Sequence, residues 1–183
     1  MNKTRIRTML IGASAVALAT TGGLLAADSA QADEQTRATT VYYSASGYQS
    51  EAAQAAQIWN DAVPNLNMVE GGNATITIEA TTGGGSRAYP CGLGCASIYI
   101  DSQDVAAGHN PLRIVSHEIG HGHTLPDNYN GDCSILMSGG SAGTSCTNPN
   151  PSAGEADRVN SAYGGGKSGG ADIDPGVYDP SLS

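Results

Sequence analysis

The chain has 183 residues, with 17 acidic and 8 basic side chains and a net charge of −9 at pH 7. This length suits one domain of ordinary size. The acidic balance argues against nucleic acid or an anionic membrane surface as a partner, because both repel a negatively charged protein. It is typical of a soluble exported protein.

The N-terminus has the features of an export signal. Basic side chains lie within residues 1–7, residues 8–27 are mostly small and apolar, and an Ala-x-Ala cleavage site ends at Ala32. A membrane anchor is the alternative, since about 20 apolar residues can span a bilayer. The many small residues and the cleavage site favour a signal peptide at residues 1–32. We therefore expect a secreted, extracellular protein without a membrane anchor, whose mature chain starts near Asp33.

Strands and one helix alternate in the next part of the chain. β-Branched and aromatic residues predict a strand at Thr39–Ser44. Apolar residues at helical spacing predict a helix at Ser50–Val63, with Trp59 as a core anchor. Alternation of apolar and polar residues predicts two further strands, at Ala74–Ala80 and Ser97–Asp101.

Turn and capping residues define the remaining elements. The Gly-Gly-Gly-Ser run at 83–86 predicts a flexible loop. Asn110 and Pro111 predict the start of a helix, because Asn caps helices and Pro suits their first turn. A last helix is predicted at Glu155–Tyr163, and a Gly-rich, acidic, disordered tail at residues 165–183. These elements predict an α+β fold, in which a small mixed sheet backs the helix that starts after Asn110.

The stretch from Ser116 to Asp127 is the most informative part of the chain, because it contains H-E-x-x-H. On a helix, His117 and His121 lie one turn apart and point the same way, so their imidazoles can hold one Zn²⁺. Glu118 lies beside them as a candidate general base. Asp127 would be a third protein ligand and would leave the fourth position open for water.

Chance is the first alternative to a metal site, since only three positions of this motif are fixed. Three of the four histidines, however, lie within residues 117–123. The helix is then followed by Leu-Pro-Asp at 125–127, which brings a hard oxygen ligand back toward the pair. A methionine-containing turn at 135–140 comes shortly after. His123 is an alternative third ligand, although on a continuing helix it faces away.

Two further residues are candidates for the same site. Met137 is predicted to pack beneath the metal in a tight turn, a role close to that of an ordinary core methionine. Tyr129 lies two residues beyond Asp127. Its phenol could donate a hydrogen bond to an oxyanion, or it could be an ordinary half-exposed tyrosine, and the spacing leaves both interpretations open.

The four cysteines predict disulfides, because an even number in an exported chain is typical of bridges. Three pairings are possible, and we favour Cys91–Cys95 and Cys133–Cys146. The second would close a loop that contains Met137. A four-cysteine metal site is the alternative, but an oxidising environment and the absence of paired C-x-x-C motifs argue against it.

Taken together, these motifs resemble those of the snapalysin family of small secreted neutral metalloproteases, in the metzincin clan. The similarity runs from Ser97 through the last helix and is looser in the N-terminal half. Its most specific parts are His117-Glu118-x-x-His121, Leu125-Pro126-Asp127-x-Tyr129, Leu136-Met137-Ser138-Gly139-Gly140 and Cys146-Thr147-Asn148-Pro149.

The resemblance implies a zinc endopeptidase with a metzincin-like fold and a catalytic domain at residues 39–164, after a short pro-segment or linker at 33–38. It implies protein or peptide substrates, with aromatic residues preferred just after the scissile bond. A small acidic secreted protein is expected to be a monomer. The implied roles are zinc binding by His117, His121 and Asp127, catalysis by Glu118 with help from Tyr129, a Met-turn at Met137, and a Cys133–Cys146 bridge.

Three residues depart from the family. Thr124 stands where the family has Gly, at a point where the chain often takes a positive φ that β-branched residues resist. Asp127 could therefore be misplaced, so the alternative function is a catalytically impaired zinc-binding module that binds or inhibits extracellular partners. The family also implies stabilisation by calcium. Asn110 replaces a calcium-binding Asp and Leu112 lies two residues further on, which argues against a Ca²⁺ ion there.

Overall fold

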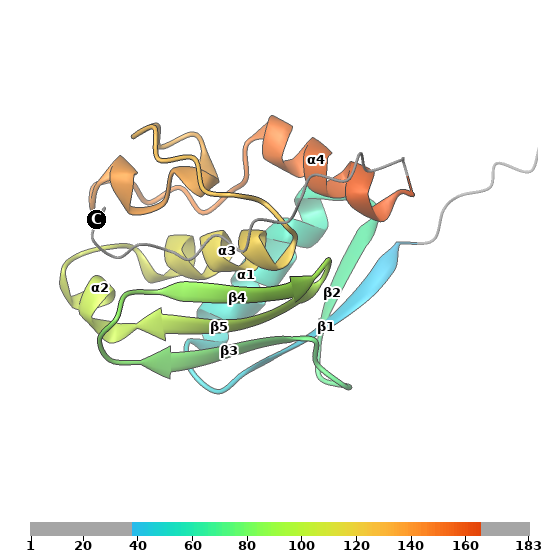
Figure 1. The fold of residues 1–183 in the computed structure, drawn as a ribbon, viewed down its shortest axis with the longest axis horizontal. Helices are drawn as coiled ribbons and strands as arrows, with labels where there is room; N and C mark the ends of the chain where they lie inside the picture. Colours follow the sequence, from blue (N-terminus) through green and yellow to red (C-terminus); the bar gives the residue numbers. More distant parts are fainter. Residues whose placement is uncertain (1–37, 166–183) are drawn as a thin grey trace, which may run out of the picture. The chain divides into compact units, whose positions relative to one another are not determined.

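The structure, a computed structural model, describes residues 38–165 (Figure 1). The predicted signal peptide at 1–32 lies outside the described residues. So do the predicted segment at 33–38 and the predicted tail at 165–183, apart from the one residue of each that adjoins the domain. Among the helices that the structure describes, none has the length and apolar character needed to cross a membrane.

Five strands form one mixed sheet in the order β2-β1-β3-β5-β4. β2, β1, β3 and β5 run parallel to one another, and β4 pairs antiparallel with β5 at one edge. The predicted mixed sheet is therefore confirmed. The strands are β1 (Thr39–Ala45), β2 (Leu66–Glu70), β3 (Ile76–Thr81), β4 (Arg87–Gly92) and β5 (Cys95–Asp101).

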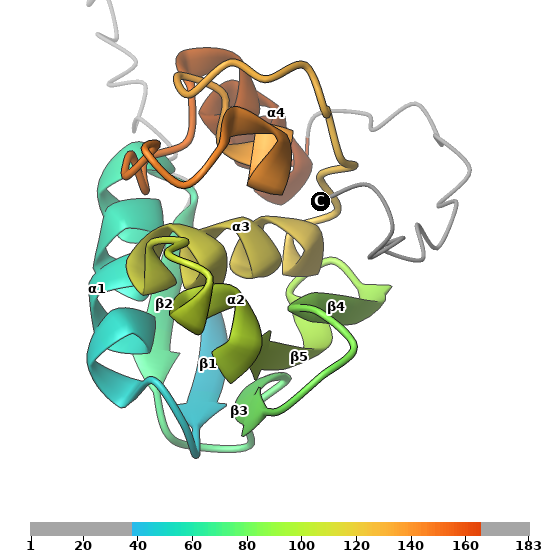
Figure 2. The same cartoon turned by 90° about the vertical axis from the view of Figure 1, so that its left-hand side faces the viewer.

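Two long helices, α1 (Gln49–Ala62) and α3 (Pro111–Gly122), lie against one face of this sheet, as Figures 1 and 2 show. The segment from the 3₁₀ helix η1 (Leu136–Ala142) to α4 (Ala153–Tyr163) lies on the other side of α3 from the sheet (Figure 2). α3 (Pro111–Gly122) therefore lies between the sheet and this segment. The helices are α1 (Gln49–Ala62), α2 (Ser102–Ala106), α3 (Pro111–Gly122), the 3₁₀ helix η1 (Leu136–Ala142) and α4 (Ala153–Tyr163).

The core lies between the sheet and the two long helices. Alternate residues of the strands point into it, among them Ile76 and Ile78 of β3 and Ile98 and Ile100 of β5. Trp59 of α1 is fully buried among them and donates a hydrogen bond from Nε1 to the carbonyl oxygen of Ser116 in α3, at 3.1 Å. The predicted role of Trp59 as a core anchor is confirmed, and this bond links α1 directly to the helix that carries the H-E-x-x-H motif.

Three elements were not predicted from the sequence. β2 has five residues and begins two residues after Pro64, and proline is typical of turns rather than of strands. β4 contains Pro90 and ends at Gly92, two residue types that disfavour strands, but its pairing with β5 overrides that preference. α2 has only five residues, too few for a clear helical period.

Residues 83–86 form a loop, as predicted, and side-chain carboxylates accept hydrogen bonds from its backbone. Asp101 accepts hydrogen bonds from the backbone N–H groups of Gly83 and Gly85, at 2.9 and 2.8 Å. Asp104 accepts from the N–H of Ser86 at 2.7 Å. The glycines make the sequence resemble a flexible linker. In the structure, the carboxylates of Asp101 at the end of β5 and Asp104 in α2 hold this loop by hydrogen bonds.

We predict that Trp59→Phe lowers the free energy of unfolding by about 2 kcal/mol, through the lost Nε1 hydrogen bond and the cavity left by the smaller ring. Urea denaturation followed by far-UV circular dichroism measures the change. Tyr42→Phe, on the exposed face of β1, is the control and is expected to leave the stability nearly unchanged. Equal stability of Trp59→Phe and the parent protein would contradict this assignment.

Candidate metal centre

Local sequence and close packing position α3. The side chain of Asn110 caps the helix by accepting a hydrogen bond from the backbone N–H of Arg113 at 2.9 Å, and Pro111 occupies the first turn, as predicted. Gly120 faces the methionine turn, where a Cβ atom would lie only 2.8 Å from Sδ of Met137. Only glycine therefore lets the turn approach the helix this closely.

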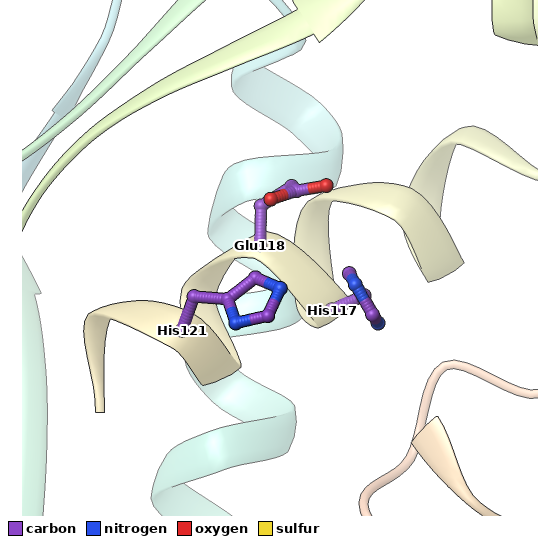
Figure 3. A group of neighbouring side chains, drawn as sticks. All are labelled: His117, Glu118 and His121. Carbon is purple, nitrogen blue, oxygen red and sulfur yellow. The ribbon is translucent and has the colours of Figure 1, made fainter. Parts of the chain in front are cut away.

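His117, Glu118 and His121 project from neighbouring turns of α3 (Figure 3), with ligand atoms that all lie within 4.8 Å of one another. All three side chains are buried, and Glu118 is only 1% exposed. Asp127 reaches the same place from beyond the end of the helix. Its Oδ1 lies 3.3 Å from Nε2 of His117 and 3.4 Å from Nε2 of His121.

Two backbone carbonyls set the orientation of the imidazoles. Nδ1 of His117 lies 3.0 Å from the oxygen of Leu136, and Nδ1 of His121 lies 2.8 Å from the oxygen of Leu125. Because a carbonyl oxygen can only accept, each Nδ1 carries the hydrogen, and each Nε2 is available as a ligand that faces Asp127.

These three atoms fit a zinc ion. Zinc–ligand distances of about 2.0–2.1 Å in a tetrahedral site place neighbouring ligand atoms about 3.3–3.4 Å apart. The two measured distances from Asp127 Oδ1 match this spacing. Within the described part of the chain, Nε2 of His117 and Oδ1 of Asp127 are buried without a hydrogen-bond partner, which a cation between them would explain.

The charges of the site depend on one another. Burial lowers the pKa of His121, but the contact with Asp127 and the charge of Glu118 outweigh burial and raise that pKa to about 9. Burial raises the pKa of Asp127, yet its contacts with both imidazoles hold that pKa well below the usual range. The metal-free pair of His121 and Asp127 therefore shares a proton at neutral pH, which a cation has to displace.

Glu118 is in a different environment from Asp127. Burial raises the pKa of its carboxyl group above the usual value, and the two imidazoles oppose this effect only in part. Although Glu118 also lies within reach of the histidines, Asp127 Oδ1 is in direct contact with both rings. The geometry thus separates a carboxylate suited to ligation from one suited to proton transfer.

The chain reaches Asp127 through Thr124, whose φ is +68°. The sequence comparison had indicated a positive φ at this position, and the strained conformation costs a β-branched residue about 1–2 kcal/mol. Two contacts hold the chain on either side of Asp127. Leu125 is buried and accepts the hydrogen bond of His121, and the N–H of Asn128 donates to the oxygen of Met137 at 2.7 Å.

His123 faces away from the site, as its spacing predicted. Its Nδ1 lies 2.9 Å from the hydroxyl of Tyr163, and its ring packs edge-on against Trp59, with centroids 5.3 Å apart. Burial lowers its pKa to about 3, so the ring is neutral. His123 therefore does not join the group formed by His117, His121 and Asp127.

The methionine turn packs against α3 next to His117. Met137 is buried, with its sulfur against Gly120 of α3. Gly139, at φ +53°, passes so close to the rings of His117 and Tyr129 that a Cβ would lie 3.1 and 3.3 Å from them. Tyr129 thus flanks the site, and its side chain is 38% exposed and accessible to a substrate.

The structure contains both disulfides that the sequence analysis favoured. Cys133–Cys146 closes the loop that carries Met137 and Gly139. Cys91–Cys95 joins β4 to β5 across their connecting turn.

Sequence reasoning missed two residues that support the site. Arg113, four residues before His117 on α3, is buried and donates to the carbonyl oxygens of Ile135 and Leu136. The carboxylate of Glu155 in α4 accepts the N–H groups of Leu136 and Met137. Ser152-x-x-Glu155 could have been recognised as a capping box, but nothing in the sequence indicates the contact with the methionine turn.

A small pocket of about 50 Å³, partly open to solvent, adjoins the site. His117 and Glu118 form one wall. The other lining residues include apolar and backbone groups from Ile114, Gly139 and Gly140, and polar groups from Asp104 and His109. His109 is half-buried.

A histidine pair in contact with one carboxylate, a second buried carboxylate beside it and a methionine turn beneath define a metalloendopeptidase of the zinc type. The chain belongs to the Streptomyces extracellular neutral proteinase (M7) family, whose model matches residues 38–166.

Several characterised proteins are similar to this chain. The extracellular small neutral protease of Streptomyces caespitosus is 45% identical over 123 residues, which cover 67% of this chain and 92% of that protein. The protein of the same name from Streptomyces lividans is 41% identical over 134 residues, which cover 69% of this chain. The chain spans 59% of the length of the Streptomyces lividans protein and 61% of its Streptomyces coelicolor counterpart.

Solved structures show more distant similarity. The structure of myroilysin has a TM-score of 0.41 and 16% identity, covering 71% of this chain and 96% of that one. High choriolytic enzyme 1, a hatching enzyme zinc-protease from the medaka fish Oryzias latipes, has a TM-score of 0.37 and 15% identity, covering 49% and 46% of the two chains.

We predict that Thr124→Gly raises the free energy of unfolding of the metal-free protein by about 0.5–1 kcal/mol, because glycine adopts the positive φ without strain although it also favours the unfolded chain. Chemical denaturation in the presence of a chelator measures this change. Thr124→Ala keeps a Cβ at the same φ and is expected to give no comparable gain. If Thr124→Gly is less stable than Thr124→Ala, φ strain does not govern this position.

Proposed function

We propose that this protein is a secreted endopeptidase that binds one Zn²⁺ ion through His117, His121 and Asp127 and uses Glu118 as its general base. The observation that carries this proposal is the convergence of two Nε2 atoms and one Oδ1 atom at the spacing of zinc ligands. When bound, the ion supplies Lewis-acid polarisation of a peptide carbonyl and lowers the pKa of a coordinated water to about 7.

Glu118 is proposed to accept a proton from the attacking water and to pass it to the leaving amine. Its burial supports this role, because the raised pKa of its carboxyl group brings it closer to neutral pH, where a group can both take and release a proton. Glu118 would not bind the ion itself.

Tyr129 is proposed to donate its phenolic hydrogen to the oxyanion that forms on the attacked carbonyl. The proximity of its ring to Gly139, on the side that also carries the ring of His117, supports this role. Its 38% exposure leaves the side chain accessible to a bound substrate.

The substrates are proposed to be proteins or peptides with an aromatic residue just after the scissile bond. The pocket beside His117 and Glu118 supports an apolar contact for a substrate side chain, since Ile114 and two glycines of the methionine turn contribute to its walls. We further propose export by the signal peptide at residues 1–32 and action as a monomer outside the cell, on protein substrates rather than on nucleic acid or membranes.

A zinc-binding module without catalysis is the second candidate, because the strained φ of Thr124 is an observation in its favour. The contact of Asp127 with both imidazoles argues for the active enzyme, since the strain does not separate the carboxylate from the pair. We propose no calcium ion at the start of α3, because Oδ1 of Asn110 already accepts the hydrogen bond of Arg113 and the side chain of Leu112 has no ligand atom.

We predict that Glu118→Gln lowers kcat for casein or a peptide substrate at least 100-fold, because the amide cannot take a proton from water. Metal analysis of the same sample is expected to find one zinc per chain, as in the parent protein. A chelator is expected to abolish the parent activity, and added Zn²⁺ to restore it.

Full activity of Glu118→Gln would exclude the proposed base. Stoichiometric zinc in a parent protein that cleaves no peptide with Tyr or Phe after the cut site would favour the non-catalytic module. Absence of zinc from the purified protein would contradict both candidates.

We predict that Tyr129→Phe lowers kcat by up to about 100-fold with little change in KM, as expected for a donor that acts mainly in the transition state. Tyr42→Phe is the matched control, because Tyr42 is exposed on β1, which does not contribute to the site. Steady-state kinetics with one peptide decides: equal kcat values for the two variants would show Tyr129 to be an ordinary surface tyrosine.

A further inference from the structure

Glu155 lies outside the H-E-x-x-H motif but contacts the peptide that orients one of its histidines. Its Oε1 accepts the backbone N–H of Met137 at 2.8 Å, and its Oε2 accepts that of Leu136 at 3.1 Å. These two N–H groups belong to the start of the methionine turn. One carboxylate of α4 thus holds two successive peptides of a segment that is 18–19 residues away along the chain.

The peptide between Leu136 and Met137, whose N–H is bound by Glu155, is held on its carbonyl side from α3. The oxygen of Leu136 lies 3.0 Å from Nδ1 of His117 and also accepts a hydrogen bond from the guanidinium of Arg113 at 3.3 Å. Arg113 and His117 are four residues apart on one helix face, so both reach this oxygen. Leu136 is therefore fixed through its N–H by Glu155 and through its oxygen by α3.

The carboxylate of Glu155 is also part of a capping box. Its Oε2 accepts the backbone N–H and the hydroxyl of Ser152, at 2.6 and 2.7 Å. The first turn of α4 and the methionine turn therefore both donate hydrogen bonds to the carboxylate of Glu155. Because four N–H or O–H donors converge on the carboxylate of Glu155, its position is well determined.

We propose that Glu155 is a positioning residue for His117. By fixing the Leu136 peptide, it holds the oxygen that accepts Nδ1–H of His117, and so keeps Nε2 of that ring directed at Asp127. The orientation of His121 does not depend on Glu155, because the oxygen of Leu125 orients that ring. This inference rests on the proposed zinc site, and it assigns to α4 the orientation of one ligand.

The test compares Glu155→Ala with Ser152→Ala in the mature secreted protein. Ser152→Ala removes one arm of the capping box and spares the contacts between Glu155 and the methionine turn. Competition with a chelator of known affinity measures zinc binding. ¹⁵N NMR of the metal-free protein measures the Nδ1–H signals of both histidines, a readout that general loss of stability does not shift selectively.

For Glu155→Ala we expect zinc affinity to fall about 10- to 100-fold. The Nδ1–H signal of His117 is expected to shift or to be lost through exchange, while that of His121 stays in place. Ser152→Ala is expected to keep the zinc affinity and both signals of the parent protein. Glu155→Gln, which retains one acceptor oxygen, is expected to fall between Glu155→Ala and the parent protein.

Parent-like zinc affinity and an unchanged His117 signal in Glu155→Ala would overturn the inference. Equal loss of affinity in Ser152→Ala would overturn it as well. If Glu155→Ala does not fold, Glu155→Gln decides by the same two readouts. A parent protein that binds no zinc contradicts the proposed function, whereas a zinc-binding parent matched by Glu155→Ala contradicts only the role of Glu155.

Discussion

The site depends on two hydrogen bonds from imidazole Nδ1–H groups to backbone carbonyls. A helix alone would place His117 and His121 on one face but would leave their rings free to rotate. The oxygens of Leu136 and Leu125 come from opposite sides, one in the methionine turn and one in the chain that leaves α3. Together they fix which nitrogen of each ring faces Asp127, which a metal site requires before any ion binds.

The enclosure of α3 explains how the chain can hold those carbonyls still. Glycines at 120 and 139 allow the helix and the methionine turn to approach closely, and the Cys133–Cys146 bridge closes the loop that carries the turn. The same close packing removes water from Glu118 and the histidines. In this environment electrostatic interactions are strong, and the pKa values of the two neighbouring carboxylates shift in opposite directions, raised for Glu118 and lowered for Asp127.

Thr124 shows how the family site tolerates a residue that its geometry disfavours. The chain still turns at a positive φ, because Leu125 is buried and Asn128 is bonded to Met137 further along. The surrounding contacts thus over-determine the path to Asp127, and the strain is retained rather than relieved. Membership of the M7 family and an intact ligand geometry are therefore compatible with this substitution.

The sequence by itself determined the local features: the spacing of the histidines, the Asn110 cap, the strands with clear alternation, and a carboxylate at Asp127 that follows the helix. These depend on residues within one or two turns of each other. Only the tertiary structure decided the pairing that makes β4 a strand, the anchoring of the loop at 83–86, and the contacts of Arg113 and Glu155 with Leu136. Those contacts join residues about 20 positions apart through single hydrogen bonds, and no periodicity or capping rule encodes which distant backbone group a buried charge will meet.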